Sequence, residues 1–341
     1  MKSEQRFAGL DSIRAVAAIW VAMAHGGAFP LRETLLALQV PATLLPASLN
    51  GLAFNSTAAV TVFFVISGFC IHWPYVGGQS LRFWPYLTRR LVRVGLPLLV
   101  VLAVVSELGG LFEGKSRAVL WTVYCELVYY ALYPLLLLLA RRVGMGRVFA
   151  GSLVLAAAIV LLNLRATHLN AFSLWLIALV CLPLWLAGCM LAQRVRTAKA
   201  AAEAEKTIWI WRVCIWAFSV LALLLVFHSP IMIGYPVTMP VLAVVSVVWL
   251  AKEMDRYRTR KPPALLEKAG AMSYSIYLTH MIAFAALAPI DWGGQFILEW
   301  LAKLGAVAAL SIVFFLLVER PAHALARALS GRIHSWSPLT T

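Results

Sequence analysis

Ten apolar stretches recur along these 341 residues and constrain the fold more than any other feature. A helix of about 20 predominantly apolar residues is long enough to cross the hydrocarbon core of a membrane. The stretches lie near 12–28, 55–77, 94–112, 119–140, 147–164, 172–192, 208–227, 233–250, 270–290 and 298–318. We therefore predict an all-α, polytopic integral membrane protein with about ten transmembrane helices, whose first partner is the lipid bilayer.

The composition excludes an ordinary soluble domain. Hydrophobic residues make up 62% of the chain and charged residues 13%, and the mean hydropathy is +0.86. Soluble domains carry about 25% charge, and disordered chains have low hydrophobicity. We expect a single membrane domain over residues 1–341, with its core at 10–321 and no extra soluble domain.

Positive charge is distributed unevenly between the loops. Alternate loops carry twenty-two Lys and Arg residues in one set and four in the other. The positive-inside rule then predicts that both termini are cytoplasmic and that the number of spans is even. The net charge of +15 is explained by this pattern, so we predict no nucleic-acid partner.

The first apolar stretch carries three ionisable residues, Asp11, Arg14 and His25. Arg14 and His25 are eleven residues apart, which places them on one helix face about 16 Å apart along the axis. Asp11 precedes Arg14 by three residues and can orient it. Ionisable groups at membrane depth are expensive and indicate function by default. The alternative is an arginine that extends to the interface and a histidine hydrogen-bonded there.

Two further groups of charged residues are candidates. Glu126 lies about as deep in its span as His25, and beside a histidine it could hold the ring tautomer. Alternatively, it is a protonated acid bonded to a neighbouring helix. Arg90 and Arg93 face the same way just before the third stretch. They could clamp phosphate groups or serve as membrane anchors.

The remaining polar residues favour cavity lining or helix packing. Ser273, Tyr277 and His280 recur at helical spacing, so they either line a cavity or bond to neighbouring helices. Ser67-Gly68 marks a point where helices can approach closely. We interpret the other histidines as interface or solvated residues: His72, His168, His228, His323 and His334. The five cysteines show no zinc spacing, and we predict no metal.

Six short motifs follow one another from residue 10 to residue 321. They are Leu10-Asp11 through Arg14 and His25; Phe63 to Phe69; Arg90 with Arg93; Trp121, Glu126, Tyr130 and Pro134; Gly270 through His280; and Glu319-Arg320-Pro321. In this order they resemble the motifs of the acyltransferase 3 family. Ser12 stands where glycine is common in that family, a difference that we expect to affect local packing.

The resemblance implies an inner-membrane enzyme that O-acylates carbohydrates, usually with acetyl from acetyl-CoA. It implies a functional set of Arg14, His25, Arg90, Arg93 and Glu126. On this hypothesis Arg14, Arg90 and Arg93 bind the phosphates of the acyl-CoA donor. His25 is the general base on a glycan hydroxyl, and Glu126 orients it. Asp11, Ser67, Tyr130, Ser273, Tyr277 and His280 are the expected cavity-lining residues.

Alternatives remain at this point. His25 could instead form an acyl-enzyme intermediate. The acceptor could be a lipid or a macrolide-like product rather than a glycan. The same buried polar residues could also line the pathway of a glycan or lipid-precursor transporter or flippase. The oligomeric state has no signal in the sequence.

Overall fold

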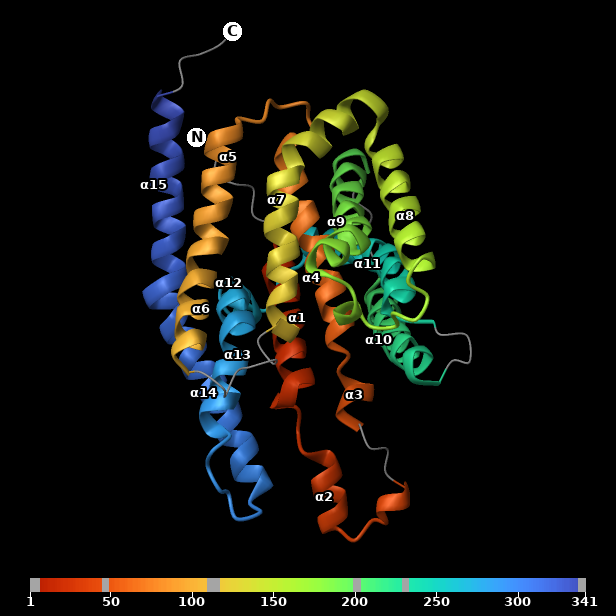
Figure 1. The fold of residues 1–341 in the computed structure, drawn as a ribbon, viewed down its shortest axis with the longest axis vertical. Helices are drawn as coiled ribbons and strands as arrows, with labels where there is room; N and C mark the ends of the chain where they lie inside the picture. The colour runs from red at the N-terminus through yellow and green to blue at the C-terminus, as the bar shows by residue number, and fades with distance from the viewer. Residues whose placement is uncertain (1–6, 45–48, 109–116, 199–203, 229–232, 337–341) are drawn as a thin grey trace.

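The computed structural model describes residues 7–44, 49–108, 117–198, 204–228 and 233–336. All regular secondary structure within these ranges is helical (Figure 1). The α-helices are α1 (Leu10–Ala22), α2 (Leu31–Ala37), α3 (Leu49–Ala53), α4 (Ser56–His72), α5 (Phe83–Arg90), α6 (Leu96–Leu108), α7 (Arg117–Val143), α8 (Met145–Leu161), α9 (Leu174–Thr197), α10 (Glu205–His228), α11 (Tyr235–Thr259), α12 (Ala264–Ala271), α13 (Ser273–Leu287), α14 (Phe296–Phe314) and α15 (Arg320–Trp336).

Three π-helical turns interrupt this pattern. They are η1 (Met23–Gly27), η4 (Leu91–Gly95) and η7 (Phe315–Glu319). The first continues α1, the second joins α5 to α6, and the third joins α14 to α15. Single π turns often mark functional positions in helices, and each of these three contains a charged or titratable residue that the site uses.

The all-helical membrane architecture is confirmed, whereas the number of spans stays a prediction. Helices occupy all ten predicted stretches. Six helices among the described residues are long and apolar enough to cross a membrane, and up to eight if each bent pair is one span. The cytoplasmic location of both termini also stays a prediction.

The two bent pairs place α1 and α13 beside each other. Leu10–Gly27 meets α2 at 45°, and α12 meets α13 at 71°. Gly26 has a φ of 126°, which is not a helical value, so the first helix ends there. Glycine adopts this conformation readily because it has no side chain. In Figure 1, α1 (red) lies in the middle of the bundle, and its neighbours are α4, α12 and α13.

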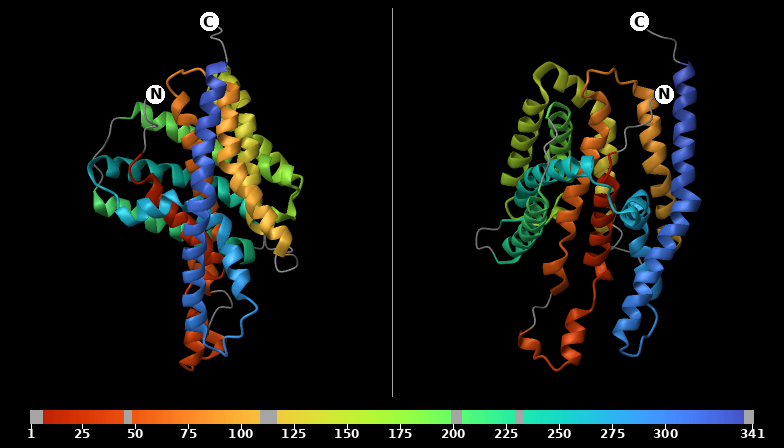
Figure 2. Two further views of the ribbon diagram at one scale, coloured as in Figure 1. Left: turned by 90° about the vertical axis from the view of Figure 1, so that its left-hand side faces the viewer. Right: turned by 180° about the vertical axis from the view of Figure 1, so that it is seen from behind.

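A long helical rod forms one side of the molecule. Helices α14 and α15 run through the π turn η7 as one near-continuous element, which Figure 2 shows along the full height of the protein. The α15 end of the rod packs against α5 and η4, and α14 packs against α13. The rod therefore brings the C-terminal region next to the arginine-bearing segment before α6.

The centre of the bundle is the crossing of α4 and α9. About 67% of the apolar window of the α4 span and 72% of that of α9 is buried inside the protein, against 11% for α10. A Cβ atom on Gly68 would lie 1.8 Å from the carbonyl oxygen of Trp185, and one on Gly188 would lie 1.9 Å from that of Val65. The predicted close approach at Gly68 is confirmed, and its partner on α9 is a second glycine.

We expect Gly188→Ala to destabilise the protein by about 1–3 kcal/mol, because overpacking a close contact shifts the backbone or forces strained rotamers. Gly151 in α8 is the matched control, since a Cβ there would meet nothing within 4 Å. Thermal unfolding of both detergent-purified variants, followed by size-exclusion chromatography, measures the difference. Equal melting temperatures for the two variants would contradict this account of the crossing.

Candidate active site

His25 and His280 face each other across the α1–α13 contact. The Nδ1 atom of His25 lies 3.2 Å from Nε2 of His280, and the two ring planes are nearly parallel, with an interplanar angle of 17° and ring centres 5.3 Å apart. His25 is half-buried, whereas His280 is completely buried. The structure thus pairs His25, the predicted base, with a residue that the sequence analysis grouped with Ser273 and Tyr277 as cavity-lining or helix-packing.

The backbone around His25 explains its position at the end of α1. The residue lies in the π turn η1, directly before Gly26, where the helix stops. The indole of Trp300 donates a hydrogen bond of 3.0 Å to the carbonyl of Gly27, and its ring packs edge-on against Phe29. His25 therefore lies at a helix end that α14 holds from the side.

Glu126 belongs to a neighbouring but separate cluster. Its Oε1 accepts hydrogen bonds from the hydroxyl of Ser67, at 2.6 Å, and from that of Tyr130. The indole of Trp185 in turn donates to the Ser67 oxygen, at 3.2 Å. Residues of α4 and α7 thus bind this carboxylate, and α9 joins the cluster through the Ser67 hydroxyl.

The expected contact between Glu126 and His25 is not formed. The hydrogen bonds of Glu126 go to Ser67 and Tyr130, and the ring partner of His25 is His280. The two side chains are therefore held by different helices, Glu126 by α4 and its own α7, and His25 by α13. The catalytic role assigned to Glu126 stays a prediction, but it does not orient His25 by direct hydrogen bonding.

Ser273 and Tyr277, which share the helical repeat of His280 on α13, have different roles. The hydroxyl of Tyr277 lies 2.5 Å from that of Thr122 and donates to the carbonyl of Val119, at 2.6 Å, which fastens α13 to α7. Ser273 is buried, and its hydroxyl has no hydrogen-bond partner within the described ranges. Among these three residues, His280 is the one that contacts the ring of His25.

Arg14, Arg90 and Arg93 converge at the other end of α1. All three lie close enough to the sulfur of Cys70 to interact with it electrostatically. Arg14 forms an ion pair of 3.5 Å with Asp11, as the sequence spacing predicted. The Nε atom of Arg90 is buried and bonds to no described residue. The structure therefore brings the predicted arginines together from α1, α5 and η4.

Tyr86 supports Arg90 from one turn earlier in α5. Its hydroxyl donates to the carbonyl of Tyr130, at 3.2 Å. Burial raises the pKa of the Tyr86 hydroxyl, and the nearby charge of Arg90 opposes this only in part. The phenol therefore keeps its proton and its bond to α7, which fixes the helix that carries Arg90.

Sequence reasoning missed two residues of this arginine cluster, Glu319 and His323. The Nε atom of Arg93 donates to Nε2 of His323, at 3.1 Å, and His323 lies 3.6 Å from the Glu319 carboxylate. Glu319 is buried and accepts bonds from the backbone and hydroxyl of Ser275, at 3.0 and 2.5 Å. His323 was expected to be an interface or solvated residue; it is half-buried, and its ring bonds to Arg93.

His72 also departs from the expectation for an interface residue. It is buried at the end of α4, with Nδ1 3.0 Å from the hydroxyl of Tyr133. The signal that could have found both His72 and His323 is their position one helix turn from a motif residue. Across the described ranges, no group of three or more His, Cys, Asp or Glu side chains gathers in a way that could hold a metal ion.

Comparisons with known proteins identify the family of this chain. The acyltransferase 3 family model, described as an acyltransferase domain, matches residues 7–318. This chain belongs to that family. A curated relative, Nodulation protein 10 of Rhizobium leguminosarum bv. viciae, is 26% identical over 326 residues, which cover 81% of this chain and 85% of the relative. No solved structure matches the chain significantly.

The family motif at the start of α1 carries a local substitution, Ser12, and the structure explains it. Both the backbone N–H and the hydroxyl of Ser12 donate to the carboxylate of Glu267, at 2.9 and 2.7 Å. A Cβ on Gly270 would lie 1.8 Å from the carbonyl oxygen of Asp11, so α12 packs directly on the first turn of α1. The expected effect on local packing is therefore an anchor between α1 and α12.

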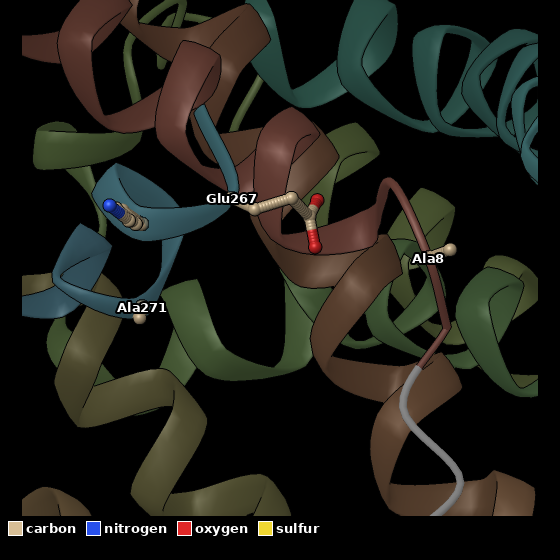
Figure 3. A pocket seen from close by; sticks show the side chains of 4 residues that line it. Ala8, Glu267 and Ala271 are labelled. Atoms are coloured by element: carbon tan, nitrogen blue, oxygen red, sulfur yellow. The ribbon is translucent and has the colours of Figure 1, made fainter. Parts of the chain in front are cut away.

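An open depression of about 460 Å³ lies beside this anchor, lined by Ala8, Glu267, Lys268 and Ala271 (Figure 3). None of the predicted catalytic or donor-binding residues lines it. Its carboxylate is already used by Ser12. We therefore do not assign the chemistry of the protein to this depression.

We expect Glu319→Ala to destabilise the protein by about 3–5 kcal/mol, because removal of one partner leaves buried polar and cationic groups without compensation. Glu319→Gln keeps an acceptor for Ser275, so its cost should be smaller. Glu33→Ala on the exposed face of α2 is the control and should leave the melting temperature unchanged. A Glu319→Ala variant as stable as this control would refute the structural role of the carboxylate.

Proposed function

We propose that this protein is a membrane-embedded O-acyltransferase of the cell inner membrane. It moves an acyl group, which we expect to be acetyl, from acyl-CoA to a hydroxyl of a surface or exported glycan. The observation that carries the proposal is the family match together with a paired imidazole at one end of α1 and an arginine cluster at the other. One helix thereby links a group that can accept a proton to groups that can bind phosphate.

The base in this proposal is His25. General base catalysis requires an imidazole whose free nitrogen can reach a substrate hydroxyl. His25 is half-buried at a helix end, and its Nδ1 atom is engaged by His280, which leaves Nε2 for the acceptor. Glu126 is retained as a second proposed catalytic residue, held by Ser67 and Tyr130.

The donor site in this proposal is the arginine cluster. Arginine guanidinium groups bind phosphate through forked, charge-assisted hydrogen bonds. Arg90 has a buried Nε atom without a described partner, and Arg14 lies on the same helix as His25. The separation of about 16 Å along that helix suits a donor with a phosphate-bearing head and a long thioester arm.

For the acceptor we propose only a chemical class, a glycan. Phe29 is 40% exposed and packs on Trp300 next to the helix end that holds His25. Aromatic faces offer large, rigid apolar area beside polar groups, which suits the mixed surface of a sugar ring. The relative is named as a nodulation protein, and that name does not state an acceptor.

We expect His25→Ala to lower kcat for acyl transfer by about 10²- to 10⁴-fold, the usual contribution of a general base. The purified protein, reconstituted in nanodiscs, is incubated with radiolabelled acetyl-CoA and candidate glycans, and label in the sugar is counted. His168→Ala, in the segment between α8 and α9, is the histidine control. Full activity of His25→Ala would remove this mechanism, and an active transport assay without label transfer would favour a flippase.

Arg90→Ala should raise KM for the acyl-CoA donor by about tenfold or more, because a charged hydrogen bond to phosphate is lost. The KM for the acceptor should change little. Arg147→Ala is the matched control, since this exposed guanidinium bonds only to the carbonyl of Val143 among the described residues. Steady-state kinetics with donor and acceptor varied in turn make the measurement. An unchanged donor KM would argue against a phosphate clamp at Arg90.

A further inference from the structure

His280 is completely buried and has no role in the mechanism proposed above. It lies on α13 behind the proposed base, and its two ring nitrogens meet different partners. Nδ1 lies 2.8 Å from the carbonyl oxygen of Tyr277 and 3.2 Å from that of Ile276. Nε2 lies 3.2 Å from Nδ1 of His25. This arrangement determines where the protons of both rings lie.

The carbonyl contacts assign the tautomer of His280. A carbonyl oxygen can only accept a hydrogen bond, so Nδ1 of His280 must be the donor. No carboxylate of the described residues lies within hydrogen-bond distance of this ring, so a neutral imidazole fits the site. A neutral imidazole with its proton on Nδ1 has a lone pair on Nε2. His280 therefore presents an acceptor to His25.

The same reasoning then assigns the tautomer of His25. Because Nε2 of His280 accepts, Nδ1 of His25 donates, and the proton of a neutral His25 ring is on Nδ1. The backbone of Val21, one turn earlier, also interacts with this ring. The lone pair of His25 is consequently on Nε2, for which the described residues show no hydrogen-bond partner.

We propose that His280 is a positioning residue that fixes His25 in the Nδ1–H tautomer and thereby makes Nε2 the base for acyl transfer. The inference rests on the proposed function of His25. A neutral histidine in water prefers the opposite tautomer, with its proton on Nε2, and that form would turn a donor toward the acceptor hydroxyl. The chain of bonds from the Tyr277 carbonyl through His280 to His25 removes this preference.

The chemical step follows from this proton placement. The acceptor hydroxyl oxygen attacks the thioester carbonyl carbon while its proton moves to Nε2 of His25. The tetrahedral intermediate collapses, the carbon–sulfur bond breaks, and the departing thiolate takes the proton back from the imidazolium. An ester and a free thiol result, and His25 returns to its neutral form. Throughout these steps, Nε2 of His280 accepts the hydrogen bond from the Nδ1–H group of His25.

The contact between the rings strengthens as the reaction proceeds. When His25 gains a proton it becomes cationic, and its Nδ1–H bond to His280 becomes charge-assisted. An interaction that is stronger in the transition state than in the ground state acts on kcat. Loss of this contact should therefore lower kcat and leave the KM values of donor and acceptor near their original values.

Two amide variants of similar polarity separate positioning from packing. The side chain of Gln places its terminal oxygen near the position of Nε2, so His280→Gln keeps an acceptor for His25. The side chain of Asn reaches only the position of Nδ1, so His280→Asn lacks this acceptor. We expect His280→Asn to lower kcat by about 10- to 150-fold, the range for a hydrogen bond to a charged group. His280→Gln should stay within about threefold of the original kcat.

The kinetics are measured with the full-length protein in nanodiscs, with melting temperature as the control for folding. Equal kcat values for the Asn and Gln variants, or a change confined to KM, would overturn the positioning role. If His25→Ala is inactive while His280→Asn keeps full kcat, the inference fails and the proposed function stands. If the unsubstituted protein transfers no label to any glycan, the proposed function itself fails.

A second measurement does not depend on how the His280 variants fold. Nitrogen-15 solid-state NMR of histidine-labelled protein in lipid reports the protonated ring nitrogen, and the His25 signals are assigned by their loss in His25→Gln. We expect His25 to carry its proton on Nδ1. A signal with the proton on Nε2 of His25 would overturn the inference, whatever the activity of the variants.

Discussion

The absence of water from the bilayer core is the constraint on which this structure depends. A polar group inside the hydrocarbon region must find its partner within the protein. The chain meets this demand by collecting its polar side chains into a few clusters around α1 and α4. His25 meets His280, Glu126 meets Ser67 and Tyr130, and Arg93 meets His323. Each cluster joins helices that are distant in the sequence.

The glycine crossing of α4 and α9 makes these clusters possible. Because Gly68 and Gly188 let the two backbones touch, Ser67 comes within reach of both Glu126 and the indole of Trp185. A bulkier residue at the crossing would move Ser67 away from α7. The polar cluster around Glu126 and the apolar packing at the centre of the bundle are therefore consequences of a single close contact.

The π turns perform a similar function for the residues at the ends of α1 and its neighbours. His25, Arg93 and Glu319 each lie in such a turn. A π turn adds a residue to the helix and changes the face on which the following side chains lie. Without it, a strict helical repeat would direct these side chains differently.

The sequence by itself determined the helical membrane architecture, because long apolar stretches have no other stable form in a bilayer. It also determined the family and the Asp11–Arg14 pair, since these depend on local spacing and on residue type. Only the tertiary structure decided the partners. That His25 pairs with His280 rather than with Glu126, and that Glu319 and His323 join the arginines, depends on how α13 and α15 pack against α1 and α5. Residues 255 positions apart meet through helix packing, and no local pattern in the chain encodes the register of that packing.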